Sequence, residues 1–261
     1  MNQKKPGQST LVTVHGYAGD RRQIEDLMPV YEHHQCPIVV MSPEDSPVLG
    51  LGPHICRTGG KRAYTGQLSL DRQYEHFRIM LEYKADFYLA NDSDSFCLNP
   101  NLPQEIYDGA ATGIIYSNQV DDFRKPGQTY TDANGSVTWP LDYHAGYDLI
   151  AMQPPYFFSR ASLEKIVATC KDIKACPTTP FIDWYFVQVA KAAGLKHAPY
   201  PNGWGASCET VTPLGVAVMS QQVSENNATF VHAIKNASVR DLLVQLYNRK
   251  HNINWKPKNH Y

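Results

Sequence analysis

Two aspartates separated by one residue, Asp92 and Asp94, are the side chains of this sequence best suited to binding a metal ion. They directly follow the run Phe87–Leu89, whose aromatic and branched residues are typical of a buried strand. Because side chains alternate along extended backbone, both carboxylates can face one point while Ser93 turns aside. Hard oxygen ligands suit Mg²⁺ or Mn²⁺, which can bridge to the phosphate oxygens of a nucleotide. The same triplet also occurs in solvated turns, so the preceding strand is what favours the metal site.

Two earlier apolar segments are predicted to be strands that end beside these aspartates. Residues 11–14 run into His15, Gly16 and Tyr17, with a helix expected over residues 20–34, and residues 37–41 run toward Asp45. Fully apolar strands are typical of a parallel sheet covered on both faces, and ligands of such sheets bind at the carboxyl ends of the strands. We therefore expect all three strand ends to share one edge of the sheet.

A loop rich in glycine and proline, residues 46–67, separates the second strand from the next helix. Its glycines allow close approach of the backbone to a ligand, and Lys61 or Arg62 can meet a diphosphate. The alternative is a surface loop with solvated cations. The helix that follows is predicted over residues 69–84, because apolar side chains recur there at steps of three and four residues.

The second half of the chain also alternates predicted strands and helices. Strands or extended segments are expected at residues 109–116, 143–152, 154–159 and 228–233. Helices are expected at residues 162–170, 181–193 and 238–247. The polar stretch 118–142 contains an Asp132–Gly135 turn that predicts a hairpin or an excursion from the sheet.

Length and composition favour one α/β domain without a demand for nucleic acid or membrane. The chain has 261 residues and a formal net charge of −1, and its first ten residues are polar rather than a signal peptide or an anchor. We expect a cytoplasmic protein, located in the host cell cytoplasm if the source is a phage. The six cysteines show no C-x-x-C pair, which favours free thiols over disulfides.

The order of these segments resembles that of GT-A glycosyltransferases, single-domain α/β enzymes that use nucleotide sugars. Three later motifs add to the resemblance. The segment Pro155–Leu163 is similar to the Y-x-x-S-R-x-x-L strand and helix of inverting members. Pro180–Asp183 lies near the place where members carry P-E-D. Thr229–Lys235 is similar to the segment that carries a late histidine in many members. The resemblance implies a GT-A type, Rossmann-like single domain with a mixed, mostly parallel central sheet.

Within that domain the resemblance implies a division of the chain into two halves with short tails. Residues 10–98 would bind the nucleotide sugar and residues 99–247 the acceptor. Residues 1–10 would form a polar tail and residues 248–261 a tail that mixes basic and aromatic side chains.

The resemblance also assigns roles to individual residues. Asp94 and His232 would hold Mn²⁺ or Mg²⁺, with Asp92 at the metal or the ribose, and Lys235 would add positive charge beside the leaving diphosphate. Asp183 would be the catalytic base of an inverting transfer, although Ile182 replaces the acid that often precedes it; in a retaining enzyme Asp183 would only position substrate.

Donor contacts are expected from the loops at the strand ends. Tyr17 would stack on the base, Asp45 would bond the base edge or the ribose, and His15 with Gly16 would line the donor site. Tyr17 and Asp45 can equally be ordinary surface residues. The family favours a UDP-sugar as donor of a hexosyl or pentosyl group.

The acceptor is the least determined aspect of the function. The aromatic and glycine-rich residues 200–205, together with His144 and Trp184, can form an acceptor wall or simply cap the core. The tail 249–261 can contact a polyanion, so a hydroxymethylated base in phage DNA is a candidate acceptor, along with saccharides and small molecules. The near-neutral net charge of the chain weakens the case for DNA. The alternatives to transfer are a nucleotidyltransferase that makes a nucleotide sugar and a protein that binds nucleotide or carbohydrate without catalysis. The oligomeric state is not indicated.

Overall fold

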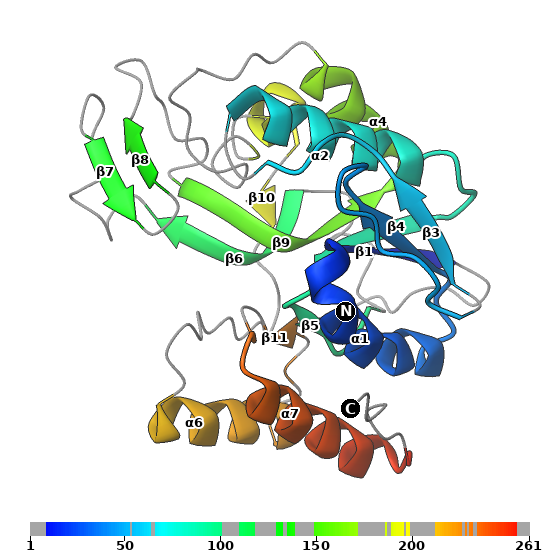
Figure 1. The fold of residues 1–261 in the computed structure, drawn as a ribbon, viewed down its shortest axis with the longest axis vertical. Coiled ribbons are helices and arrows are strands. Elements are labelled where there is room, and N and C mark those ends of the chain that lie inside the picture. Colours follow the sequence, from blue (N-terminus) through cyan, green and yellow to red (C-terminus); the bar gives the residue numbers. More distant parts are fainter. Residues whose placement is uncertain are drawn as a thin grey trace.

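A mixed β-sheet forms the centre of the structure, a computed structural model (Figure 1). Within the described residues the sheet has seven strands in the order β10-β6-β9-β4-β1-β2-β3. The structure describes residues 9–52, 54–63, 66–100, 110–117, 129–132, 135–138, 149–171, 186, 189–195, 197–198, 212–225, 228, 230–231 and 234–254. The strands of the sheet are β1 (Thr10–His15), β2 (Ile38–Ser42), β3 (Ile55–Thr58), β4 (Phe87–Asp92), β6 (Ala110–Ser117), β9 (Leu149–Ser159) and β10 (His197–Ala198).

Only β9 runs against the other strands of this described sheet. It pairs antiparallel with both β4 and β6, whereas β1 pairs parallel with β2 and β4, β2 with β3, and β10 with β6. The sheet is therefore mixed and mostly parallel, which confirms the fold class predicted from the sequence.

Helices cover both faces of the sheet. In Figure 1, α2 (Gly66–Met80) and α4 (Arg160–Cys170) lie on one side, and α1 (Arg21–His33), α6 (Pro213–Ser224) and α7 (Ala237–His251) lie on the other. Alternation along β1 decides which side chains meet which layer: Val12 and Val14 pack with α1 and α7, and Leu11 packs with α2 and α4. Two buried layers explain why β2 is buried at every position.

The turn after β1 leaves little room for a side chain at position 16. A β-carbon built on Gly16 would lie 2.9 Å from Ile24 Cδ1 and 3.2 Å from Asp20 Oδ2. The turn leads through a short 3-10 helix, η1 (Ala18–Asp20), into α1, so the predicted strand, glycine turn and helix are all present. The first turn of the helix can therefore approach the end of β1 closely.

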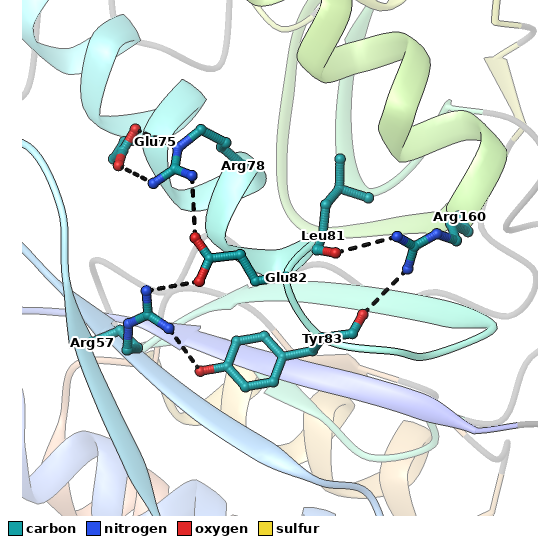
Figure 2. Close-up of polar contacts among 7 residues, drawn as sticks. All are labelled: Arg57, Glu75, Arg78, Leu81, Glu82, Tyr83 and Arg160. Carbon is teal, nitrogen blue, oxygen red and sulfur yellow. Dashed lines mark hydrogen bonds and ion pairs between the residues drawn. The ribbon is translucent and has the colours of Figure 1, made fainter.

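Polar contacts fix the connection between α2 and β4 (Figure 2). Arg78 pairs with Glu75 and Glu82, and Glu82 also accepts from Arg57 Nη2 at 2.8 Å. From the start of α4, the guanidinium of Arg160 donates to the carbonyl oxygens of Leu81 and Tyr83 and to Tyr88 Oη at 2.7 Å. Exposed ion pairs stabilise little individually, but this network holds the turn that leads into β4.

Several predicted elements are confirmed with small shifts of their ends. The predicted helix 69–84 is α2, and the helices predicted at 162–170 and 238–247 are α4 and α7. The hairpin predicted around Asp132–Gly135 is formed by β7 (Thr129–Asp132) and β8 (Gly135–Thr138). Of the helix predicted at 181–193, only Phe186 and the residues from Val189 onward lie among the described residues.

Three differences from the sequence prediction have physical reasons. Within the predicted loop 46–67, residues 55–58 form β3, a short edge strand that pairs parallel with β2 although its side chains are not fully buried. The extended segments predicted at 143–152 and 154–159 are continuous over residues 149–159, where they form the single strand β9, because that strand pairs along both edges. Helix α6 was not predicted; its Thr212 side chain caps the amide of Gly215, and Pro213 follows at the first helical position.

The described residues contain no helix that is both long enough and apolar enough to cross a membrane. Cys36, Cys56, Cys97 and Cys170 are free thiols, as the sequence predicted for them.

The start of α4 supplies a test of the fold. Ser159 is its N-cap, and the hydroxyl accepts a hydrogen bond from the amide of Ser162 at 3.2 Å. We expect Ser159→Ala to lower the free energy of unfolding by about 1 kcal/mol and Ser159→Thr, which keeps a capping hydroxyl, to lower it by less. Urea unfolding measures both variants, and equal losses would contradict the capping role.

Candidate functional site

The carboxyl ends of β1, β2 and β4 meet at one edge of the sheet. His15, the last residue of β1, is in register with Asp92 on β4 and with Met41 on β2. The amide of Ser93 continues this pairing by donating to the carbonyl of His15 at 2.9 Å. The expected placement of residues 15–19, 42–45 and 92–94 at a shared edge is therefore confirmed.

The two aspartates of the triplet occupy different local structures at this edge. Asp92 is the last residue of β4, and Asp94 lies in the turn that follows, where the Ser95 amide donates to the Asp92 carbonyl at 3.1 Å. Both carboxylates are partly exposed. They offer oxygen ligands of the kind that Mg²⁺ or Mn²⁺ prefers.

The segment before α7 lies against the Asp94 turn. The amide of Ile234 donates to the carbonyl of Asp94 at 2.9 Å, and Lys235 Nζ lies 3.8 Å from Asp94 Oδ2. Lys235 is exposed, so this long ion pair is weak and its ammonium can turn toward a ligand phosphate. The structure thus brings together two residues that the sequence predicted for the site, although they are far apart in the chain.

Asp20 adds a third carboxylate that the sequence analysis did not identify. Its Oδ2 accepts from the Tyr17 amide at 3.1 Å, and its carboxylate also accepts from the Ser93 side chain. The pKa of Asp20 is raised, chiefly because the carboxyl is buried and also because the charge of Asp94 is near. The glycine of the turn is the sequence signal that could have found it, since the chain after Gly16 folds back onto this edge.

The loop after β3 folds onto the loops after β1 and β2. The Arg62 guanidinium carbon lies 4.1 Å from the centre of the Tyr17 ring, and the Arg62 amide donates to Asp45 Oδ1 at 2.8 Å. Tyr17, Asp45 and Arg62 are therefore neighbours, with the exposed Lys61 beside them. One face of Tyr17, expected to stack on a base, is covered here by the guanidinium.

His15 is half-buried, points to the α2 side of the edge and pairs with the buried His76. Its Nδ1 lies 3.2 Å from His76 Nδ1 on α2, and its Nε2 lies 3.0 Å from Thr13 Oγ1. Burial, reinforced for both rings by the nearby charge of Arg72, holds the pKa of His15 well below its usual range and lowers that of His76 to about 3. Both rings are neutral at pH 7, and His15 supports α2 rather than reaching outward.

The face of α2 above this pair carries buried polar groups. Ser69 Oγ and Gln73 Nε2 lie below 1 Å² of exposed area and have no hydrogen-bond partner among the residues that the structure describes. Helix α2 connects the end of β3 to the start of the parallel strand β4, so its first turns lie at the carboxyl edge. With a rise of about 1.5 Å per residue, Gln73 and Ser69 lie successively farther beyond His15.

Some predicted site residues lie outside the described residues. These are Asp183, His232, His144, Trp184 and residues 200–205. Within the described residues, no group of three or more histidine, cysteine, aspartate or glutamate side chains could hold a metal ion. An ion bound by Asp92 and Asp94 would need a further ligand, from the substrate or from another segment of the chain.

Comparison with known proteins gives only structural similarities. No protein-family model and no curated protein matches the sequence. The apo structure of the bifunctional glycosyltransferase WbbM is similar with a TM-score of 0.48 and 12% identity, over 95% of this chain and 53% of that chain, so this chain spans about half its length. The inositol-1-phosphate CTP transferase of T. maritima is similar with a TM-score of 0.45 and 13% identity. The match covers 97% of this chain and 100% of that chain.

A third similar structure is the apo-form glycosyltransferase GlyE of Streptococcus pneumoniae TIGR4. Its TM-score is 0.44 at 10% identity, over 97% of this chain and 66% of that chain. The function proposed below rests on the residues at the carboxyl edge and not on these similarities.

The neutral histidine pair predicts a pH dependence of stability. The unfolded chain protonates histidine below about pH 6.5, whereas folded His76 stays neutral until about pH 3, so the unfolded state binds more protons and stability falls as the pH falls. Between pH 7 and pH 5 we expect His76 to account for a loss of about 2 kcal/mol. Urea unfolding of wild type and of His76→Gln at both pH values measures this change in the free energy of unfolding. An equally steep decrease in the variant would contradict the assignment of the pH dependence to His76.

Proposed function

We propose that this protein is a metal-dependent glycosyltransferase that moves a sugar from a nucleotide sugar to an acceptor hydroxyl. One observation carries the proposal: Asp92 ends the central strand β4 beside the end of β1, and Asp94 follows it within 3.8 Å of Lys235. Two carboxylates, a cation and a glycine turn at the carboxyl edge of a mostly parallel sheet suit a bound nucleoside diphosphate. With the diphosphate bound there, the sugar of the donor would be open to attack by an acceptor.

The proposed reaction breaks the bond between the anomeric carbon and the β-phosphate oxygen and forms one to the acceptor oxygen. A Mn²⁺ or Mg²⁺ ion, held by Asp92, Asp94 and His232, would supply charge for the leaving diphosphate. Lys235 adds a second positive charge there. Asp183 would take the proton of the acceptor hydroxyl, and attack opposite the leaving group would invert the anomeric centre.

The nucleoside half of the donor would lie over the loops that follow β1, β2 and β3. Gly16 allows close approach of backbone, and Asp45 is exposed to bond the base edge or the ribose. The contact between Arg62 and Tyr17 offers a flat surface for a uracil base, either on the guanidinium or on the ring once Arg62 moves aside. A UDP-sugar is the donor we propose.

The sugar half of the donor would lie on the α2 side of Asp92. Strand alternation directs Asp92 to that side, because Tyr88 and Ala90 of the same strand pack in the core beneath α2. Gln73 and Ser69 are buried there without described hydrogen-bond partners, and hydroxyl groups, which both donate and accept, can satisfy them. The neighbouring histidines are neutral and Arg72 places a positive charge close to them, so these buried groups would bind sugar hydroxyl groups beside a cation.

The main test is a donor screen. The purified protein is incubated with Mn²⁺ and each common nucleotide sugar, and release of nucleoside diphosphate is recorded alone and with saccharides or hydroxymethylated DNA. We expect release from one donor, at least about 100-fold slower in Asp94→Asn, because the variant loses a ligand charge. Asp241→Asn removes an exposed carboxylate on α7 and serves as the matched control.

Two outcomes would contradict the proposal. Pyrophosphate release from a nucleoside triphosphate and a sugar 1-phosphate would identify a nucleotidyltransferase instead. Binding of a nucleotide sugar without release, in the presence of every acceptor, would indicate a binding protein.

A second variant tests where the sugar lies. We expect Gln73→Leu to raise the KM for the donor about tenfold and to leave inhibition by the free nucleoside diphosphate unchanged, since only the sugar would lose a hydrogen bond. Arg78→Gln changes an exposed α2 residue that pairs with Glu75 and should alter neither value. Unchanged donor KM in Gln73→Leu would place the sugar elsewhere.

A further inference from the structure

A buried arginine lies directly behind the Asp92–Asp94 turn. Arg240, in the first turns of α7, is 2% exposed, and its Nε donates to Asp26 Oδ2 on α1 at 3.0 Å. The Asp26 carboxyl is also buried, which raises its pKa, while the guanidinium opposes that effect. The two charges form an ion pair across 214 positions of sequence.

The rest of the guanidinium binds backbone carbonyls from three segments. Nη1 donates to the carbonyls of Ser93 at 3.3 Å and Ile234 at 3.0 Å, and Nη2 donates to that of Gln23. Ser93 is the central residue of the aspartate triplet, and Ile234 directly precedes Lys235. A planar guanidinium with five donors can serve all these acceptors at once, which an ammonium group cannot.

Packing of α7 does not require a buried charge. Val239, Leu243, Val244 and Tyr247 already anchor the helix in the core that it shares with α1. A buried ion pair is often no more stabilising than well-packed apolar residues of similar size, because both charges lose their hydration. A contribution to stability therefore does not explain why this ion pair is buried here. The carbonyl groups to which Arg240 donates suggest a more specific role.

We propose that Arg240, oriented by Asp26, is a positioning residue that holds Asp94 and Lys235 in the geometry of the site. It fixes the Ser93 carbonyl on one side and the Ile234 carbonyl on the other, and the Ile234 amide in turn holds the Asp94 carbonyl at 2.9 Å. The carboxylate and the ammonium are thereby placed relative to each other by one buried group. For the metal and the diphosphate, this inference rests on the proposed function.

The test separates positioning from stability with paired substitutions. Arg240→Met alone leaves Asp26 buried without its partner, so we expect a lower urea midpoint. The double variant Asp26→Leu with Arg240→Met removes both charges, and we expect its midpoint to return near that of wild type. Arg22→Met with Asp241→Leu is the matched control, because that exposed pair also joins α1 to α7, at 3.8 Å, without contacting the turn.

Two measurements then report on the turn itself. Titration with Mn²⁺ alone should show affinity about 10- to 100-fold weaker in the double variant than in wild type, the usual effect of losing a group that orients metal ligands. Hydrogen exchange of the peptide that contains the Ile234 amide should be faster in the double variant and unchanged in the control pair. Arg240→Lys, which keeps the charge but loses the fork, should fall between wild type and Arg240→Met in exchange rate.

The outcomes distinguish this inference from the proposed function. If the double variant recovers wild-type Mn²⁺ affinity and wild-type exchange together with its midpoint, Arg240 is only structural and the inference is wrong. If wild type binds no Mn²⁺, either alone or with UDP present, the proposed function fails, and the exchange of the Ile234 amide still decides whether Arg240 positions the turn.

Discussion

The buried ion pair between Asp26 and Arg240 is the constraint on which the carboxyl edge depends. It joins α1 to α7 and directs donors to the backbone carbonyls of Ser93, in the aspartate turn, and of Ile234, in the segment before α7. Desolvation makes such a pair costly when it is incomplete, so the arrangement persists only while every segment is in place. The geometry of Asp94 is thus tied to segments from both ends of the chain rather than to its own loop.

The elements that could be predicted from the sequence are those that local pattern determines. The apolar runs that became β1, β2 and β4 can only be buried on both faces, and a strand buried on both faces belongs inside a parallel sheet. The parallel arrangement of these strands was enough to predict that His15, Asp45 and Asp92 lie at the same edge of the sheet. The helical period of α2 was equally clear, because apolar side chains recur at steps of three and four residues, and Phe77 and Met80 in its second half pack in the core.

The features that could not be predicted depend on contacts between distant residues. Strand β3 has no apolar alternation of its own and owes its conformation to pairing with β2. Asp26 and Arg240 look like surface charges in the sequence, since each lies in a helix with other charged residues, and only the packing of α7 against α1 buries them. His76 is likewise one polar residue among several in α2 until His15 is placed beside it.

The edge divides into two faces with different electrostatic character. On the α2 side, burial keeps His15 and His76 neutral, so the polar groups there can hydrogen-bond but bring no charge from the imidazoles. On the other side, the carboxylate of Asp94 lies near Lys235, in front of the buried charge of Arg240. A nucleotide sugar suits this division, because its diphosphate would lie near Lys235 while the hydroxyl groups of its sugar would meet the uncharged polar side chains of α2 beside Arg72.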